Sequence, residues 1–295
     1  MSDTRKKALF TALVAVLVVA VVIISVVISL EGTKTGVGDA KVVSTPAGEI
    51  EKIEVNDIYE GKITRPFFEK MAVNTYEKDK FISTNNIITY DSEDAKIGID
   101  VSGYQGDINW EQVKASGVDF AIIRVGYRGN TQGKLELDSK FKQNMEGAIA
   151  AGLDVGVYFF STSITVKEAE EEATFVLEHI RNYPTKYPVV YDWERGHYEK
   201  ERNGNSTGAE VTAFTEAFCK KIEQAGRKAA FYTNKSMAYN FFNLNTLANY
   251  DMWYAEYMPA PSLYYDFKIW QYTEEGSVPG IEGPVDMNIS FKKYS

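Results

Sequence analysis

The chain has 295 residues, 44% of them hydrophobic, which is enough for one large globular domain or two small ones. Its net charge of −9 excludes the basic footprint of a general nucleic-acid binder, so no nucleic-acid partner is expected. The single cysteine, Cys219, excludes an intramolecular disulfide and a cysteine-rich zinc site. Two histidines offer little material for a metal site, so we expect no metal and a Cys219 that is a buried, small hydrophobic residue.

The N-terminal region predicts a membrane anchor. Residues 9–30 carry no charge and consist mainly of Val, Ala, Ile and Leu, and about 20 such residues cross a bilayer. The alternatives are a core helix and a cleaved signal peptide, whose apolar region is usually about 7–15 residues and ends in a small-residue motif that is absent here. Because three basic residues at positions 5–7 precede the run, residues 1–8 are expected in the cytoplasm. Everything after residue 30 is then expected outside the cell membrane.

Residues 31–96 are expected to form an extracellular spacer. The first part, 31–50, is rich in Gly, Thr, Ser and Ala, as is usual for a linker. The second part, 51–95, places aromatic residues such as Phe67, Phe68 and Phe81 among many charges. It could include a short helix or strand that packs onto the following domain, and its role stays open.

From residue 96 onward, short apolar runs alternate with amphipathic stretches, which predicts an α/β fold with a parallel sheet over a domain at 97–295. Eight such strands can close into a barrel. Gly117, Gly152 and Gly226 follow three of the predicted helices, where glycine commonly ends a helix. The charged helix at 165–181 is expected to present its charges to solvent. Strands are predicted at 97–101, 120–125, 155–160, 189–191, 229–232, 252–255, 268–271 and 285–288, and helices at 110–116, 139–151, 166–181 and 208–225.

Three predicted strands end in carboxylates: Asp100 on the first, Asp192 and Glu194 on the fourth, and Asp286 on the last. In a βα-barrel the active site lies at the carboxyl ends of the strands, so these four side chains are expected to converge. Asp192 and Glu194 are two residues apart, which places both on one face of a strand, roughly 7 Å apart along the chain. Two carboxyl groups in a partly apolar pocket repel each other, so one pKa should rise and provide a proton donor beside an anion. Glycoside hydrolysis uses such a pair.

Other side chains near the predicted strand ends are expected to contact a substrate, because aromatic rings with polar edges suit sugar rings. His197 follows the Asp192–Glu194 pair in a charged loop, and it either lines the cleft or is solvated. The residues expected to contact substrate are Tyr158, Phe160, Arg124, Gln105, Tyr232, Trp253, Gln271 and Asn288.

The segment from about 97 to 291 resembles the lysozymes of glycoside hydrolase family 25, the Chalaropsis-type muramidases. The resemblance covers about two thirds of the chain. One departure is Phe159, which stands where many members have histidine; strand alternation points it away from the face of Tyr158 and Phe160. The segments that carry the resemblance are GIDVSGYQG at 98–106, INW at 108–110, FAIIR at 120–124, GVYFFS at 156–161, YDWE at 191–194, WQYT at 270–273 and VDMN at 285–288.

The resemblance implies a flattened, TIM-like (β/α)5(β)3 barrel and hydrolysis of the β-1,4 bond between N-acetylmuramic acid and N-acetylglucosamine in peptidoglycan. It implies Glu194 as general acid, Asp192 as the carboxylate that stabilises the positive centre or assists the substrate's acetamido group, and Asp100 and Asp286 as an acidic floor. No cofactor is expected, because water and two carboxyl groups suffice. Two alternatives stay open: a non-catalytic peptidoglycan-binding module of the same fold, and a hydrolase of another β-1,4 glycan such as chitin.

Overall fold

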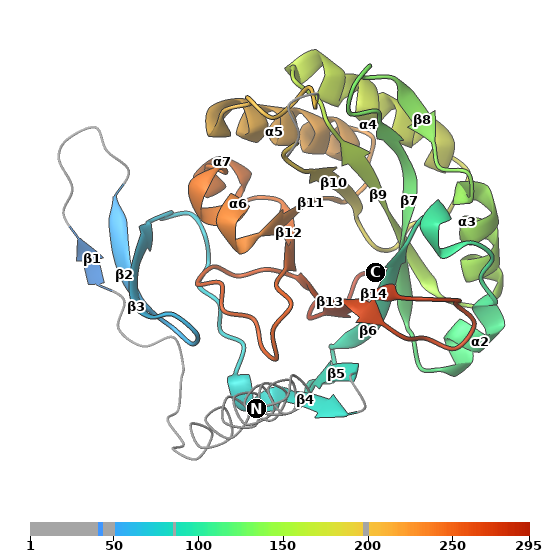
Figure 1. The fold of residues 1–295 in the computed structure, drawn as a ribbon, viewed down its shortest axis with the longest axis horizontal. Coiled ribbons are helices and arrows are strands. Elements are labelled where there is room, and N and C mark those ends of the chain that lie inside the picture. The colour runs from blue at the N-terminus through green and yellow to red at the C-terminus, as the bar shows by residue number, and fades with distance from the viewer. Residues whose placement is uncertain (1–40, 44–50, 85–86, 197–200) are drawn as a thin grey trace, which may run out of the picture. The chain divides into compact units, whose positions relative to one another are not determined.

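The computed structural model of the protein describes residues 41–43, 51–84, 87–196 and 201–295. The predicted anchor at 9–30 and His197 lie outside these residues. Within the described ranges, no helix is long and apolar enough to cross a membrane. The described residues belong to one compact unit that is built around a closed barrel of strands (Figure 1).

Eight strands form the barrel, and all eight strands expected from the sequence are present, which confirms the α/β barrel. Each strand pairs with the next around the ring, and pairing of β6 with β7 closes it. A short strand, β8 (Leu135–Leu137), pairs with the end of β7. The barrel strands are β6 (Lys96–Val101), β7 (Phe120–Arg128), β9 (Asp154–Ser161), β10 (Val189–Trp193), β11 (Ala229–Asn234), β12 (Asp251–Ala255), β13 (Ile269–Gly276) and β14 (Val285–Ser290).

The last strand corrects the expectation of an entirely parallel sheet. β6 to β13 run parallel around the ring, but β14 is antiparallel to both of its neighbours, β13 and β6. The connection from β13 to β14 is short and has no crossover helix, and an antiparallel return is the geometry that such a connection allows. As a result, the beginning of β14 lies at the same end of the barrel as the carboxyl ends of the other strands.

Helices follow the first five barrel strands and lie outside the ring (Figure 1), whereas β12 to β14 are joined without helices. Side-chain caps on Asn109, Thr165, Thr207 and Asn234 begin four of the helices. Positive φ angles at the three glycines predicted to follow helices confirm that assignment. The helices are α2 (Trp110–Ala115), α3 (Phe141–Ala150), α4 (Val166–Ile180), α5 (Gly208–Gln224), α6 (Lys235–Asn240) and α7 (Leu244–Leu247).

The strands alternate between two apolar layers. Outward-facing residues pack against the helices in one large cluster that includes the buried Cys219, as expected. Gly98 has no room for a side chain inside the barrel, because a Cβ there would lie 2.2 Å from the ring of Phe120. The second cluster fills the barrel interior and contains Phe120, Ile122, Tyr187, Val190, Ala230, Trp253, Ile269 and Tyr294.

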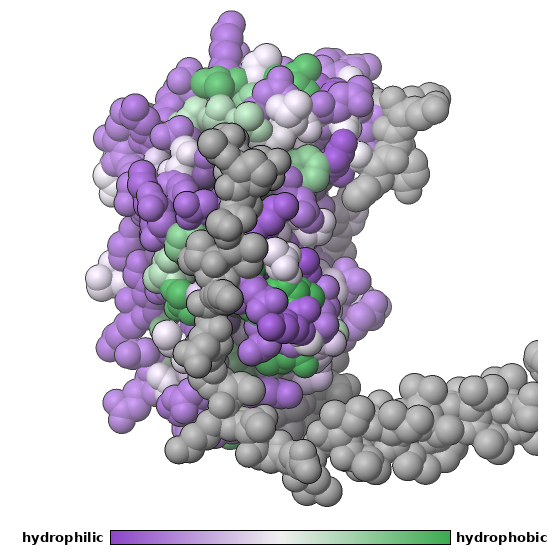
Figure 2. Space-filling model, turned by 90° about the vertical axis from the view of Figure 1, so that its left-hand side faces the viewer, coloured by the Kyte–Doolittle hydropathy of each residue, from purple (hydrophilic) through white to green (hydrophobic). Residues whose placement is uncertain are grey.

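The residues before the barrel form two small β units, one that packs beside α6 and one on the side of the barrel without helices. Three ring contacts join the hairpin and the connection between the two units to the rest of the domain: Phe81 to Trp270 at 5.2 Å between centroids, Phe68 to Tyr265 at 5.4 Å, and Tyr76 to Phe291 at 4.0 Å. The face on the side of β1 to β3 is mostly hydrophilic (Figure 2), whereas Ile53 and Val55 of β2 are buried. The units are a sheet of β1 (Lys41–Val43), β2 (Lys52–Asp57) and β3 (Gly61–Pro66), and a hairpin of β4 (Phe81–Thr84) and β5 (Ile87–Tyr90).

Candidate active site

Four carboxylates lie at one end of the barrel. Asp100 in β6 is the direct register partner of Asp286, the second residue of β14. Asp192 is the fourth residue of β10, and it interacts electrostatically with Glu194, Asp100 and Asp286. The reversed direction of β14 explains why Asp286 joins the group from the beginning of its strand, although the sequence placed it at a strand's end.

A hydrogen-bond network holds Asp100. Its Oδ2 accepts hydrogen bonds from Gln271 Nε2 at 2.9 Å and from Asn288 Nδ2 at 2.8 Å. Asn288 Oδ1 in turn accepts from Trp253 Nε1 at 2.7 Å, and Gln271 Oε1 accepts from the Tyr232 hydroxyl at 2.8 Å. These residues come from four strands, so the barrel itself fixes the position of the carboxylate.

Three of the residues expected to contact substrate lie beneath the site. Trp253, Gln271 and Asn288 are all at most 4% exposed. Gln271 and Asn288 bond Asp100, and Trp253 bonds Asn288, so these polar groups are used within the barrel. Tyr158 and Tyr232 are half-buried and pack edge-on against Trp253, with ring centroids 6.0 and 5.0 Å away. They form an aromatic wall above the barrel core.

Burial raises the pKa of three carboxyl groups. The pKa of Asp192 is raised well above its usual value by burial and then by the charge of Glu194, and that of Asp100 by burial and then by Asp286. Burial, followed by the charge of Glu274, raises the pKa of Asp286 to about 6. The expected rise therefore falls on the buried member of the Asp192–Glu194 pair and extends to the two partner carboxylates.

Asp192 keeps one acceptor open. Its Oδ1 is buried and has no hydrogen-bond partner among the described residues, although the barrel contains many donors. A buried carboxylate oxygen without a partner is unfavourable, and such groups are usually kept for a ligand or for chemistry. This atom can accept a hydrogen bond from a bound molecule.

Glu194 lies one residue beyond β10 and is exposed, so the pair does not share a regular strand as the sequence suggested. The intervening Trp193 points outward and donates from Nε1 to the Ser163 carbonyl at 2.9 Å. Asn203 holds the backbone here: its Nδ2 donates to the Glu194 carbonyl at 2.6 Å, and its Oδ1 accepts from Gly196 N at 3.1 Å. The loop thus places an accessible carboxylate beside a buried one.

Three other predicted contact residues differ in their surroundings. Arg124 is engaged by Asp138, whose Oδ2 lies 2.8 Å from both Nε and Nη2 of the guanidinium. Gln105 uses its Oε1 to accept from Ser102 N at 2.9 Å, so its side chain caps a short 3-10 turn instead of reaching into the cleft. Phe160 is half-buried at the end of β9.

Phe159, the departure from the family pattern, faces away from the cleft as expected. It is fully buried in the outer layer and lies edge-on to Phe175 of α4, with 5.9 Å between ring centroids. Its ring therefore contributes to barrel–helix packing.

The sequence left two neighbours of the site out of the predicted set. Tyr257 donates from its hydroxyl to Gln271 Oε1 at 3.0 Å, and the residue is 46% exposed. Only its place just after a predicted strand could have indicated it. Glu274 acts on Asp286 through its charge, and no motif marks it. Within the described ranges, no group of three or more His, Cys, Asp or Glu side chains is arranged to hold a metal ion.

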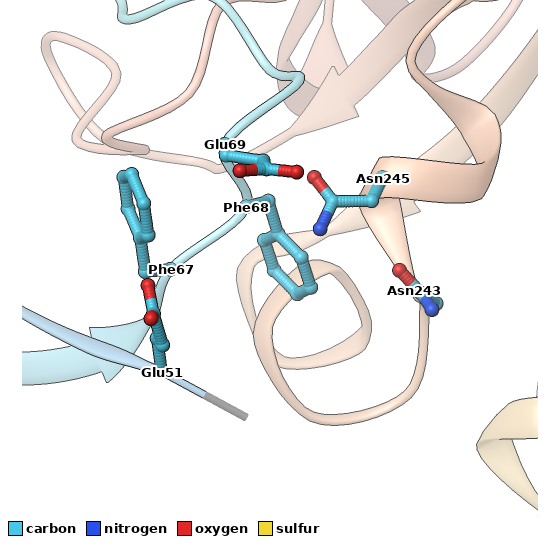
Figure 3. A pocket seen from close by; sticks show the side chains of 6 residues that line it. All are labelled: Glu51, Phe67, Phe68, Glu69, Asn243 and Asn245. Carbon is cyan, nitrogen blue, oxygen red and sulfur yellow. The ribbon is translucent and has the colours of Figure 1, made fainter. Parts of the chain in front are cut away.

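A pocket of about 340 Å³ lies elsewhere, between the N-terminal segment and the region of α7 (Figure 3). None of its lining residues belongs to the carboxylate group. Asn245 in its wall accepts a hydrogen bond from Lys70 N at 3.0 Å, so the pocket marks a seam between two packed segments. Its lining consists of Glu51, Phe67, Phe68, Glu69, Asn243 and Asn245.

A closed α/β barrel with acidic side chains gathered at the carboxyl ends of its strands defines the class of TIM-like barrel proteins with a site at that end. The family model described as glycosyl hydrolases family 25 matches residues 99–281, and the chain belongs to this family. The resemblance seen at about 97–291 is thereby confirmed.

Known relatives agree with this assignment. Lysozyme M1 of Streptomyces globisporus is 30% identical over 204 residues, which are 65% of this chain and 66% of that protein. A family 25 glycosyl hydrolase from Bacillus anthracis has the same fold, with a TM-score of 0.58 at 22% identity over 72% of this chain and 96% of that one. The autolysin LytC from Streptococcus pneumoniae, solved with a synthetic peptidoglycan ligand, gives 0.58 at 21% identity over 84% and 57%. The family match and the similarity to Lysozyme M1 support the expected glycoside hydrolase of lysozyme type, and the two solved structures share its fold.

Proposed function

We propose that the protein hydrolyses the β-1,4 bond between N-acetylmuramic acid and N-acetylglucosamine in peptidoglycan. The observation that carries the proposal is the group of four carboxylates at the barrel end, with an exposed Glu194 beside a buried Asp192. Membership of family 25 and the similarity to a lysozyme support it. The peptidoglycan ligand bound by the autolysin LytC supports the choice of substrate.

In this proposal Glu194 is the general acid. It gives its proton to the glycosidic oxygen as the bond from that oxygen to the sugar C1 breaks. Water then adds its hydroxyl to C1, and the remaining proton of the water returns to the Glu194 carboxylate. Asp192 stabilises the positive charge at C1 or accepts a hydrogen bond from the substrate's 2-acetamido N–H. Its unpartnered Oδ1 suits either role, and Asp100 with Asp286 keeps this end of the barrel acidic.

The first experiment incubates purified peptidoglycan with the full-length protein or with Glu194→Gln. Wild type should release new reducing ends, and borohydride reduction followed by mass spectrometry should identify them as muramic acid. Loss of the acid should lower the rate by about 10²–10⁴-fold. Glu178→Gln, an exposed position on α4, is the matched control and should keep wild-type activity.

The same experiment separates the two alternatives. A folded wild-type protein that binds peptidoglycan without releasing reducing ends would instead be a non-catalytic binding module. Cleavage of chitin in preference to peptidoglycan would identify a hydrolase of another β-1,4 glycan.

We also propose that residues 9–30 hold the protein in the cell membrane, with residues 1–8 in the cytoplasm and the barrel facing the wall. The uncharged run and the basic residues before it support this arrangement. The full-length protein should sediment with membranes and resist extraction by alkaline carbonate, whereas a chain beginning at residue 31 should stay in the supernatant. Protease added outside intact protoplasts should remove the barrel; a protected barrel would contradict the orientation.

A further inference from the structure

We propose that the β2–β3 hairpin, which lies outside the matched family domain, positions the loop at 256–262 and through it sets one wall of the substrate cleft. The hairpin tip contacts loops that follow β11 and β12, at the same end of the barrel as the carboxylates. The inference rests on the proposed function for its substrate. It assigns Tyr59 as a positioning residue.

The tip of the hairpin is a closed turn. Asp57 Oδ1 accepts hydrogen bonds from the backbone N–H groups of Tyr59, at 2.8 Å, and Glu60, at 2.9 Å. Gly61 completes the turn with a φ of 73°, a conformation that glycine adopts without strain. The turn therefore presents the Tyr59 side chain in one defined direction.

Tyr59 is bonded twice to the same distant residue. Its hydroxyl donates to the carbonyl oxygen of Ala260 at 2.8 Å and accepts from the Ala260 N–H at 3.0 Å. The two residues are 201 positions apart. One phenol thus satisfies both backbone groups at the middle of the loop.

A shared cation makes a second connection. Lys235, the first residue of α6, lies 2.5 Å from both Asp57 Oδ2 and Glu60 Oε1, and 4.0 Å from Glu256 Oε1. Glu256 also accepts hydrogen bonds from the backbone N–H of Ser262 at 2.6 Å and from its hydroxyl at 2.5 Å. Both ends of the loop are therefore tied together and to the hairpin.

The loop carries Tyr257 to the site. The Tyr257 hydroxyl bonds Gln271, and Gln271 bonds Asp100, so two hydrogen bonds separate the loop from the carboxylate group. The exposed Tyr257 ring offers a flat surface beside the carboxylate group, and such a surface suits a sugar ring. The hairpin packs on the core through the apolar side chains of Ile53 and Val55. Its polar tip takes no part in that packing and makes the hydrogen bonds to the loop.

The test compares wild type with Tyr59→Phe in steady-state kinetics on soluble peptidoglycan fragments. Loss of the hydroxyl should raise KM about 5–10-fold and leave kcat within twofold, because the loop loses its anchor but the carboxylates stay in place. Lys62→Met is the matched control; Lys62 pairs with Glu54 in the same hairpin and should leave both constants unchanged. An unchanged KM, or a fall in kcat alone, would overturn the proposal.

A double-mutant cycle with Tyr257→Phe tests the route of the effect. If Tyr59 acts through Tyr257, the second substitution should add less than twofold to KM once the first is present. Fully additive increases in KM would show that Tyr59 does not act through that residue.

Amide hydrogen exchange gives a measurement that needs no activity. In Tyr59→Phe the N–H groups of the five non-proline residues in the loop at 256–262 should exchange faster than in wild type, while those of β10 should not change. Unchanged exchange in the loop would overturn the proposed positioning. Failure of the wild type to cleave or bind peptidoglycan would instead contradict the proposed function, and the exchange result would still test the loop.

Discussion

At the scale of single residues, the carboxylate group places negative charge where the barrel is least able to stabilise it. Burial raises the pKa of Asp100, Asp192 and Asp286, so their charged forms are disfavoured in the folded state. Below the pKa that such a carboxyl group has in the unfolded chain, the free energy of unfolding keeps its full value. It falls as the pH rises through the pKa that the group has in the folded protein. The site therefore lowers the stability of the fold at neutral pH, as active sites commonly do.

Asp286→Asn should stabilise the protein at pH 7.5 but not at pH 3.5. The folded pKa of Asp286 is about 6 and the ordinary value is 3.8, so at pH 7.5 the folded state carries an unfavourable charge that asparagine lacks. After allowance for partial exposure, we expect a gain on the order of 1–2 kcal/mol in the free energy of unfolding. Urea unfolding at both pH values measures it; an equal change at the two values would contradict this cause.

At the scale of elements, α4 forms a buried ion pair with β7 and a partly exposed ion pair with the loop after β10. Glu172 of α4, expected from the sequence to face solvent, is fully buried and bonds Arg128 Nε at 2.6 Å. Glu168, on the same helix, receives both terminal nitrogens of Arg202, at 2.9 and 2.6 Å. Arg202 is next to Asn203, so this ion pair fixes the loop that carries Glu194.

Asn203→Ala should lower the rate of hydrolysis about 10-fold or more. The substitution removes the donor to the Glu194 carbonyl and the acceptor for Gly196 N, which leaves two partly buried backbone groups unpaired and costs about 1–3 kcal/mol locally. Initial rates and thermal midpoints should be measured together. Asn203→Asp keeps an acceptor for Gly196 N and should lose less activity than alanine. A rate that follows global stability alone would argue against a local effect on Glu194.

At the scale of the whole molecule, the N-terminal segment takes the place of helices. β12, β13 and β14 are joined without helices, and their outer apolar residues are covered by rings from residues 68–90. Phe68 and Ile88 are 2% and 8% exposed in this contact. Burial of an apolar side chain of this size contributes roughly 1.5–3 kcal/mol, so the covering segment contributes substantially to stability.

A chain beginning at residue 97 should be much less stable than one beginning at residue 51. Removal of the segment uncovers Trp270, Tyr265 and Phe291, and we expect a fall in thermal midpoint of more than about 10 °C or aggregation. Phe81→Ala, which removes one ring from the same contact, should cost about 2 kcal/mol. Equal midpoints for the two chains would show that the barrel does not need the cover.

The sequence predicted the barrel because its signals are local. Each strand is a short apolar run, each long helix has a polar start or a glycine end, and Asp100 and Asp192 stand at the ends of predicted strands. These features depend on neighbours within a few residues, so periodicity finds them. The family resemblance then added the role of each carboxylate and the bond expected to be cleaved.

The tertiary structure alone decided the features that depend on distant residues. No local pattern shows that β14 runs antiparallel, that Glu172 meets Arg128, or that Tyr59 bonds Ala260 across 201 positions. The alternating charges of α4 resemble those of a solvated helix until a buried arginine is placed opposite one of them. Local chemistry therefore determined the barrel and its carboxylates, whereas the packing of remote surfaces decided what surrounds the cleft.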